Sequence, residues 1–235
     1  MNSEITIQQG FPDVLRSEAA ALYDAAFGSK LSIAIPDTNQ RIDFLREGFR
    51  PDFCFVAMSD SKLVGIAGFN TATGGFHEEN AFVRLHAQLG LLGAIRASVV
   101  LLFFERKCEN GQLLIDGISV APEKRGSDIG SSLLRQLQEH ARIGGYHTLL
   151  LEVIDTNPAA RRLYERLGFV ATGKTSFNYL RGLLGFGAAI TMEYPVYNSA
   201  SVGALTPLAT PCRERKALNG YSMVMAAPKP SSLRR

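Results

Sequence analysis

The chain has 235 residues, of which 46% are hydrophobic and 20% are charged, a composition that excludes a disordered protein or a fibre and allows a buried core. Residues 197–235 carry six Lys and Arg against one Glu, and this +5 leaves −2 of the net +3 for residues 1–196, which excludes a basic nucleic-acid-binding surface there. The three cysteines form no CxxC pair and the first ten residues do not resemble a signal peptide, so we expect a cytoplasmic protein with no metal site and no disulfide framework.

The first eighty residues alternate between strand and helix patterns. Alternating apolar residues predict strands, and apolar residues at helical spacing predict helices. Two β-rich runs separated by three polar residues predict a hairpin. In chain order the pattern predicts a strand ending before Pro12, helices over Val14–Phe27 and Arg41–Phe49, a hairpin of residues 53–58 and 62–69 turning at Ser59–Ser61, and a loop over 70–82.

The stretch Leu85–Phe104 is the best candidate for a membrane span, because it is long enough to cross a bilayer. It contains His86 and Gln88, and Arg96 lies near its middle, where a charged side chain costs about 2.5–3.5 kcal/mol in a spanning helix. We therefore expect a buried or substrate-covering helix, inserted at about residues 80–107, and no stable membrane insertion. Association with a membrane surface is the alternative.

The second half of the chain alternates strands and helices more regularly. It predicts strands at 113–121 and 148–154, a helix over Ile129–Ile143, a helix from Asn157-Pro158 to Gly168, and strands over Phe169–Thr175 and Ala188–Val196. Strands joined through helices pair in parallel, so we expect an α/β fold with a mixed, partly parallel central sheet flanked by helices. Residues 197–235 have four prolines and no apolar period, which predicts a disordered basic tail.

The loop VAPEKRGSDIGSSLL (120–134) carries the first indication of chemistry. It is basic, contains glycine and opens directly onto a helix, whose N-terminal N–H groups attract phosphate. Lys124 and Arg125 can add charge-assisted hydrogen bonds. Taken alone, the same pattern also fits a plain surface turn.

A second motif follows at the segment NPAARRLYERLGF (157–169). This segment resembles the N-x-x-A-x-x-L-Y-x-x-x-G-F signature of the Gcn5-related N-acetyltransferase (GNAT) superfamily. The preceding loop resembles the R/Q-x-x-G-x-G/A pyrophosphate loop of the same family, and an apolar strand separates the two motifs. The resemblance covers roughly residues 50–196 and implies a GNAT-like domain over residues 1–196.

By this resemblance, the chain transfers the acetyl group of acetyl-CoA directly to an amine acceptor, either a small molecule or an amine of a peptide or protein. Acetyl-CoA is then the cosubstrate, and no nucleic acid is a partner. The backbone of the strand at 113–121 pairs with the pantetheine arm, and the loop 120–134 binds the pyrophosphate. The start of the helix at Asn157-Pro158 lines the pantetheine. The residues implied are Ile118 and Val120, then Arg125, Gly126, Gly130 and Ser131, and then Asn157 and Ala160.

The resemblance further implies that Tyr164 donates a proton to the departing CoA thiolate. Tyr164 lies on the inward stripe of its helix, where a tyrosine can also simply pack. An ammonium with a pKa near 10.4 must lose a proton before it attacks a thioester. Asp116, after three aliphatic residues, is our first candidate for this base; Glu152 and a chain of water molecules remain alternatives.

One position departs from the family pattern, because Asp128 stands where the loop has its first glycine. Asp tolerates a left-handed backbone and caps helices, so its carboxylate can turn away from the ligand; otherwise it repels the pyrophosphate. The second case leads to an alternative function, a degenerate relative that binds an acyl-CoA or a partner without turnover. A third reading is a membrane-surface or partner-binding module. Homodimerisation is left open.

Overall fold

The computed structural model describes residues 4–78, 81–102, 108–178 and 181–196. Its first half contains β1 (Ile5–Gln9), α1 (Arg16–Leu31), α2 (Thr38–Gly48), β2 (Cys54–Ser59), β3 (Lys62–Thr71), β4 (Gly74–Gly75) and α3 (Ala81–Leu102). Its second half contains β5 (Gln112–Val120), α4 (Ile129–Ile143), β6 (Thr148–Ile154), α5 (Pro158–Arg166), β7 (Val170–Ser176), α6 (Arg181–Leu184) and β8 (Ala188–Pro195). The disordered tail expected for residues 197–235 lies outside the described residues.

The predicted α/β fold with a partly parallel sheet is confirmed. The sheet has the order β1-β2-β3-β5-β6-β8-β7, with β4 paired to β3. β5 and β6 are parallel, because α4 crosses between them, and the other pairs in this order are antiparallel. α4 and β6 have the bounds expected from the sequence.

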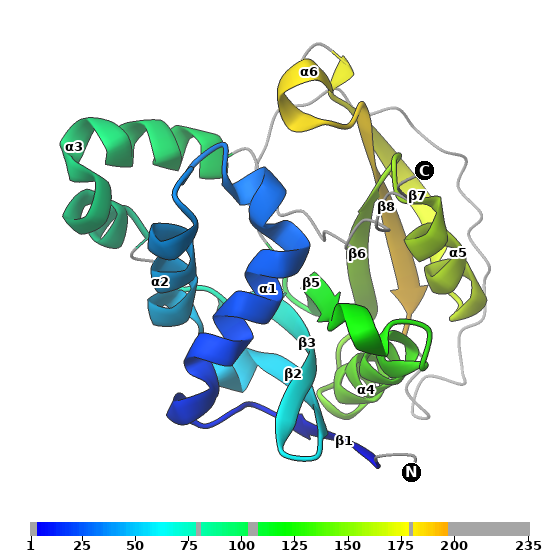
Figure 1. Ribbon diagram of the computed structural model, residues 1–235. Coiled ribbons are helices and arrows are strands. Elements are labelled where there is room, and N and C mark those ends of the chain that lie inside the picture. Colours follow the sequence, from blue (N-terminus) through cyan, green and yellow to red (C-terminus); the bar gives the residue numbers. More distant parts are fainter. Residues whose placement is uncertain (1–3, 79–80, 103–107, 179–180, 197–235) are drawn as a thin grey trace, which may run out of the picture.

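Helices cover both faces of this sheet (Figure 1). α4 and α5 bury their apolar stripes on one face, in a core that contains Leu133, Leu137 and Tyr164. α1 lies on the other face, in a second core that contains Tyr23 and Phe27. The sheet therefore separates two sets of side chains, and only its strands can connect them.

Several elements differ from the expectation. α2 begins at Thr38, three residues before its predicted start, and β4 lies in the segment predicted to be a loop. α1 continues to Leu31, four residues past the predicted end, through Gly28. A Cβ at Gly28 would lie 2.6 Å from a carboxylate oxygen of Asp24, and Asp24 forms a buried ion pair with Arg41 of α2. The glycine thus makes room for the pair that joins α1 to α2. The short α6 also lies in a segment expected to be a loop.

The apolar stretch forms α3, which breaks at Gly90 (φ 68°) and packs against α2 (Figure 1). It also packs against Ala34 and Ile35, in the segment that follows α1. Arg96 donates from Nη2 to the carbonyl oxygen of Ala34 (3.1 Å). In the portion of the chain that the structure describes, no helix combines the length and apolarity needed to cross a membrane.

Candidate active site

The sheet opens in its middle, between β5 and β6. The two strands pair only over Gln112–Leu114 and Thr148–Leu150. Beyond these residues β5 continues to pair with β3, and β6 with β8, but no described strand lies between them. The facing edges of β5 and β6 therefore have no neighbouring strand among the described residues, and an extended ligand can pair with the backbone there.

A β-bulge lies where β5 leaves β6. Gly117 pairs with Gly68 and Ile115 with Phe69, so Asp116 is the extra residue that bulges between these two pairs. The bulge turns both Asp116 and Gly117 toward α1: Asp116 is bonded to Tyr23, and a Cβ at Gly117 would lie 2.8 Å from the Tyr23 hydroxyl. The side chain of Ile118 returns to the other face of the sheet.

The free edge of β5 carries Ile118 and Val120, the two residues expected to pair with pantetheine. The carbonyl oxygen of Val120 already accepts a hydrogen bond from Nε of Arg125 (3.3 Å). The Arg125 side chain is therefore folded back over the end of β5. Arg125, which we expect to bind the pyrophosphate, thus lies beside the edge of β5, which we expect to pair with pantetheine.

The start of α4 is suited to bind an anion. Asp128 at its N-cap position makes no side-chain cap, so the N–H groups of the first turn do not bond to that carboxylate. Gly126 has a φ of +87°, which a side chain would strain. A Cβ at Gly130 would lie 3.9 Å from both Val120 and Leu163, an ordinary contact, so packing alone does not require glycine there.

Asp128 takes the left-handed conformation (φ 61°) but does not cap the helix through its side chain. Its carboxylate accepts from Nη1 of Arg135 (3.0 Å), two turns along α4. Hydrogen bonds from Ser131 and Arg135 lower the pKa of the Asp128 carboxyl. The negative charge is therefore paired along the side of the helix.

α5 brings three of the expected residues together. Oδ1 of Asn157 accepts from the backbone N–H of Ala160 (3.1 Å), which confirms the predicted side-chain cap. Tyr164 lies one turn further on, is 1% exposed and packs against Phe169. Burial raises the pKa of the Tyr164 phenol, so the hydroxyl holds its proton at neutral pH.

The two candidate bases lie on the opposite face from Tyr164. Asp116 accepts from the Tyr23 hydroxyl (2.9 Å) and from Nδ2 of Asn70 (3.1 Å). Glu152 on β6 is 2% exposed and accepts from the hydroxyl of Thr191 (3.3 Å). The sheet thus separates Tyr164, the expected proton donor, from Asp116 and Glu152, the candidate proton acceptors.

Sequence reasoning did not identify the surroundings of Asp116. Nδ1 of His77 lies 3.5 Å from Oδ2 of Asp116, and Tyr23 and Asn70 complete the group. Tyr23 belongs to an ordinary amphipathic helix pattern, and His77 to a polar segment without periodicity. No local signal in the sequence connects these residues with Asp116.

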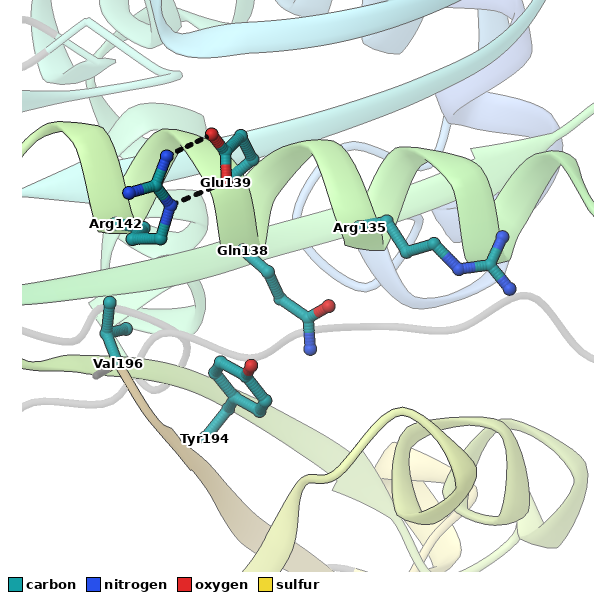
Figure 2. Close-up of a pocket in the computed structure, with 6 residues that line it drawn as sticks. All are labelled: Arg135, Gln138, Glu139, Arg142, Tyr194 and Val196. Carbon is teal, nitrogen blue, oxygen red and sulfur yellow. Dashed lines mark hydrogen bonds and ion pairs between the residues drawn. The ribbon is translucent and has the colours of Figure 1, made fainter. Parts of the chain in front are cut away.

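A separate hollow of about 260 Å³ lies beside the second half of α4. Figure 2 shows the residues that line it, Arg135, Gln138, Glu139, Arg142, Tyr194 and Val196. Arg142 pairs with Glu139 (2.6 Å), and Gln138 donates to the carbonyl of Leu167 (2.9 Å). None of the expected site residues lines this hollow, and its charged side chains are already paired. The candidate site is therefore the opening between β5 and β6.

Residues 19–169 match the family model described as "Acetyltransferase (GNAT) family". The chain is 38% identical over 90 residues to "Streptothricin acetyltransferase" of Streptomyces lavendulae, a match covering 38% of this chain and 44% of that protein. It is 34% identical over 90 residues to "Probable N-acetyltransferase camello" of Xenopus tropicalis, covering 38% of this chain and 40% of that protein. The matches thus span less than half the length of these relatives.

The fold also resembles solved structures. One is the crystal structure of an N-acetyltransferase from Staphylococcus aureus Mu50, with a TM-score of 0.59 and 18% identity, covering 80% of this chain and all of that chain. This likeness concerns the fold alone. Among the described residues, no group of three or more His, Cys, Asp or Glu side chains is arranged to hold a metal ion.

Proposed function

The chain belongs to the acetyltransferase (GNAT) family, and we propose that it transfers the acetyl group of acetyl-CoA directly to an amine acceptor. The observation that carries this proposal is the opening between β5 and β6, which ends at the uncapped start of α4. An extended arm on the free edge of β5 leads from an anion site to the bulge at Asp116. This arrangement matches the shape of CoA, a diphosphate joined to a linear thiol arm.

The residues present fit such a ligand. The start of α4 is surrounded by Arg125, Gly126, Gly130 and Ser131. Backbone N–H groups and one guanidinium bind the pyrophosphate there. Ile118 and Val120 supply backbone groups to the arm from β5. Asn157 and Ala160 supply the opposite wall from the start of α5. Acetyl-CoA bound in this way has its thioester near the bulge.

The chemistry uses both faces of the sheet. An amine that arrives from the α1 face gives up a proton there, on the side where Asp116 and Glu152 lie. Its nitrogen forms the C–N bond with the thioester carbonyl carbon, and the C–S bond breaks. Tyr164 lies on the α5 face and gives its proton to the departing thiolate. No nucleophilic side chain is needed.

The experiment combines binding with turnover. Titration of the chain with acetyl-CoA measures the cosubstrate affinity, and release of free CoA thiol is followed across small alkyl amines, peptides with free N-termini and lysine-containing peptides. We expect binding and thiol release with at least one acceptor. Binding without release across the panel would support the alternative of a non-catalytic acyl-CoA-binding relative.

A matched pair of arginine variants tests the anion site. Arg125→Ala removes a charge-assisted bond to the pyrophosphate, and we expect a roughly tenfold weaker Kd for acetyl-CoA, about 1.4 kcal/mol. Arg161→Ala is the control, because Arg161 is an exposed α5 residue paired with Glu165 (2.8 Å). Equal affinities of both variants and the parent would contradict the assignment of Arg125.

A further inference from the structure

The carboxylate of Asp116 is already occupied. Oδ2 accepts from the Tyr23 hydroxyl, Oδ1 accepts from Nδ2 of Asn70, and the side chain is only 12% exposed. A carboxylate that is this enclosed and already accepts two hydrogen bonds leaves little room for an incoming ammonium. Asp116 is therefore built to hold other groups in place rather than to exchange a proton with a ligand.

His77 is held on this carboxylate. Oδ1 of Asn70 accepts from the backbone N–H of Phe76 (2.9 Å), so the same amide that bonds Asp116 also fixes the segment that carries His77. His77 pairs with Phe49 in an isolated β-bridge. Its ring lies 5.0 Å from that of Phe76 and 5.7 Å from that of Tyr23, centroid to centroid.

The two ring nitrogens of His77 differ in their surroundings. Nδ1 faces Asp116 at 3.5 Å, no described residue hydrogen-bonds Nε2, and the side chain is 32% exposed. The charged and titratable groups that face it are Asp116 from β5, Tyr23 from α1 and Arg84 from α3. Burial lowers the pKa of His77; Asp116 opposes this effect and Arg84 adds to it, so the imidazole is neutral near pH 7.

We propose that His77 is the general base of the reaction, and that Asp116 is a positioning residue that orients its imidazole. The proposal rests on the proposed function. The proton is placed on Nδ1, which lies 3.5 Å from Oδ2 of Asp116. This leaves the lone pair on Nε2 for the amine, an arrangement in which a carboxylate selects the tautomer of a catalytic histidine. His77 lies where β5 leaves β6, on the face from which the acceptor arrives.

The proton balance of the step is complete. The ammonium gives one proton to Nε2, and the neutral nitrogen forms the C–N bond as the C–S bond breaks. The thiolate takes the proton of Tyr164, and the second proton of the former amine returns to Tyr164 through solvent. The imidazolium releases its proton to solvent, so the products are the amide, free CoA and one proton.

An imidazole also suits this proton transfer better than a carboxylate. Transfer from an ammonium of pKa near 10.4 to a group of pKa near 6.5 is unfavourable by a factor of about 10⁴, against about 10⁶ for an ordinary aspartate. A base near the operating pH is the most effective. The imidazole of His77 is thus the better-matched base, and the neighbouring carboxylate of Asp116 positions it.

The test is His77→Asn in the full chain, because the Asn amide can still donate to Asp116 but cannot accept a proton. We expect kcat to fall by about 10²–10⁴, while Kd for acetyl-CoA and Tm stay near those of the parent. The acid limb of kcat/KM, expected below the ordinary imidazole pKa, should disappear. His86→Asn is the control, because His86 is an exposed histidine on α3 and should leave rate and profile unchanged.

A second measurement does not depend on turnover. Nitrogen NMR of the imidazoles should show His77 of the parent protonated on Nδ1, and Asp116→Asn should remove this preference. A parent that binds acetyl-CoA but acetylates no amine would contradict the proposed function and this base together. A working parent beside a His77→Asn variant with unchanged kcat and acid limb, or a parent His77 protonated on Nε2, would contradict the base alone.

Discussion

The two faces of the sheet differ in how their functional residues are distributed along the chain. On the α4 and α5 face, the residues assigned to acetyl-CoA lie between Ile118 and Tyr164. On the α1 face, the contacts of Asp116 reach Tyr23, 93 residues away. The first set depends on backbone features of consecutive elements, and the second on side chains that only the fold brings together. Substitutions on the α1 face should therefore lower kcat alone, whereas the α4 and α5 face should contain both residues that change the Kd for acetyl-CoA and Tyr164, which affects kcat.

The largest expected effect is on the α1 face. In Asp116→Asn the amide nitrogen replaces one carboxylate oxygen and cannot accept a hydrogen bond there: at Oδ1 it faces the Asn70 amide, and at Oδ2 it faces the Tyr23 hydroxyl and Nδ1 of His77. Either placement disrupts the group that orients the imidazole. We expect kcat to fall at least about a hundredfold, with little change in Kd for acetyl-CoA. Steady-state kinetics with an amine identified by the panel, together with acetyl-CoA titration, measure both quantities.

The control for this variant is Asp43→Asn, because Asp43 is a half-exposed acid on α2 paired with Arg46 (3.0 Å). It should behave like the parent. A weakened acetyl-CoA affinity in Asp116→Asn with unchanged kcat would reverse the assignment of the two faces.

A smaller effect on kcat is expected on the α4 and α5 face. Tyr164→Phe keeps the buried ring and removes the hydroxyl, so kcat should fall at least about tenfold, or 1.4 kcal/mol, while acetyl-CoA still binds. Tyr146→Phe provides a matched loss of a hydroxyl from a tyrosine that packs at the edge of the same core. If Tyr164→Phe turns over like the parent, Tyr164 is a packing residue only.

The smallest effect is expected at the departure from the family pattern. Because the Asp128 carboxylate is paired with Arg135 and bonded to Ser131, it does not need to face the pyrophosphate. Glycine accepts its left-handed backbone, so Asp128→Gly should change Kd for acetyl-CoA by less than about twofold, a few tenths of a kcal/mol. Titration at two salt concentrations measures this. A gain of fivefold or more that shrinks with salt would mean that the carboxylate repels the ligand.

Much of the fold could be predicted because its signals are local. The helix Ile129–Ile143 has one apolar stripe, and the continuous apolar run at 148–154 fits a strand covered on both faces. α1 was predicted too short, because its continuation through Gly28 depends on the ion pair with α2. The short α6 had no periodicity long enough to detect.

The residues of the anion site follow a contiguous motif, so their neighbourhood at the start of α4 could be expected from the sequence. The opening of the sheet could not, because it depends on how far β5 and β6 stay paired. Nor could the orientation of Asp128, whose carboxylate bonds to a residue two helical turns away. Their roles in binding remain predictions for the experiments above.

The sequence by itself determined the elements, the parallel crossover and the two motifs that indicate the family, because periodicity, capping residues and glycines act over one or a few helical turns. Only the tertiary structure decided what surrounds Asp116. A β-bulge turns this residue toward α1, and the amide of Asn70 ties it to the segment of His77. Such contacts depend on the register of strands and the packing of helices distant in sequence, and no pattern along the chain records them.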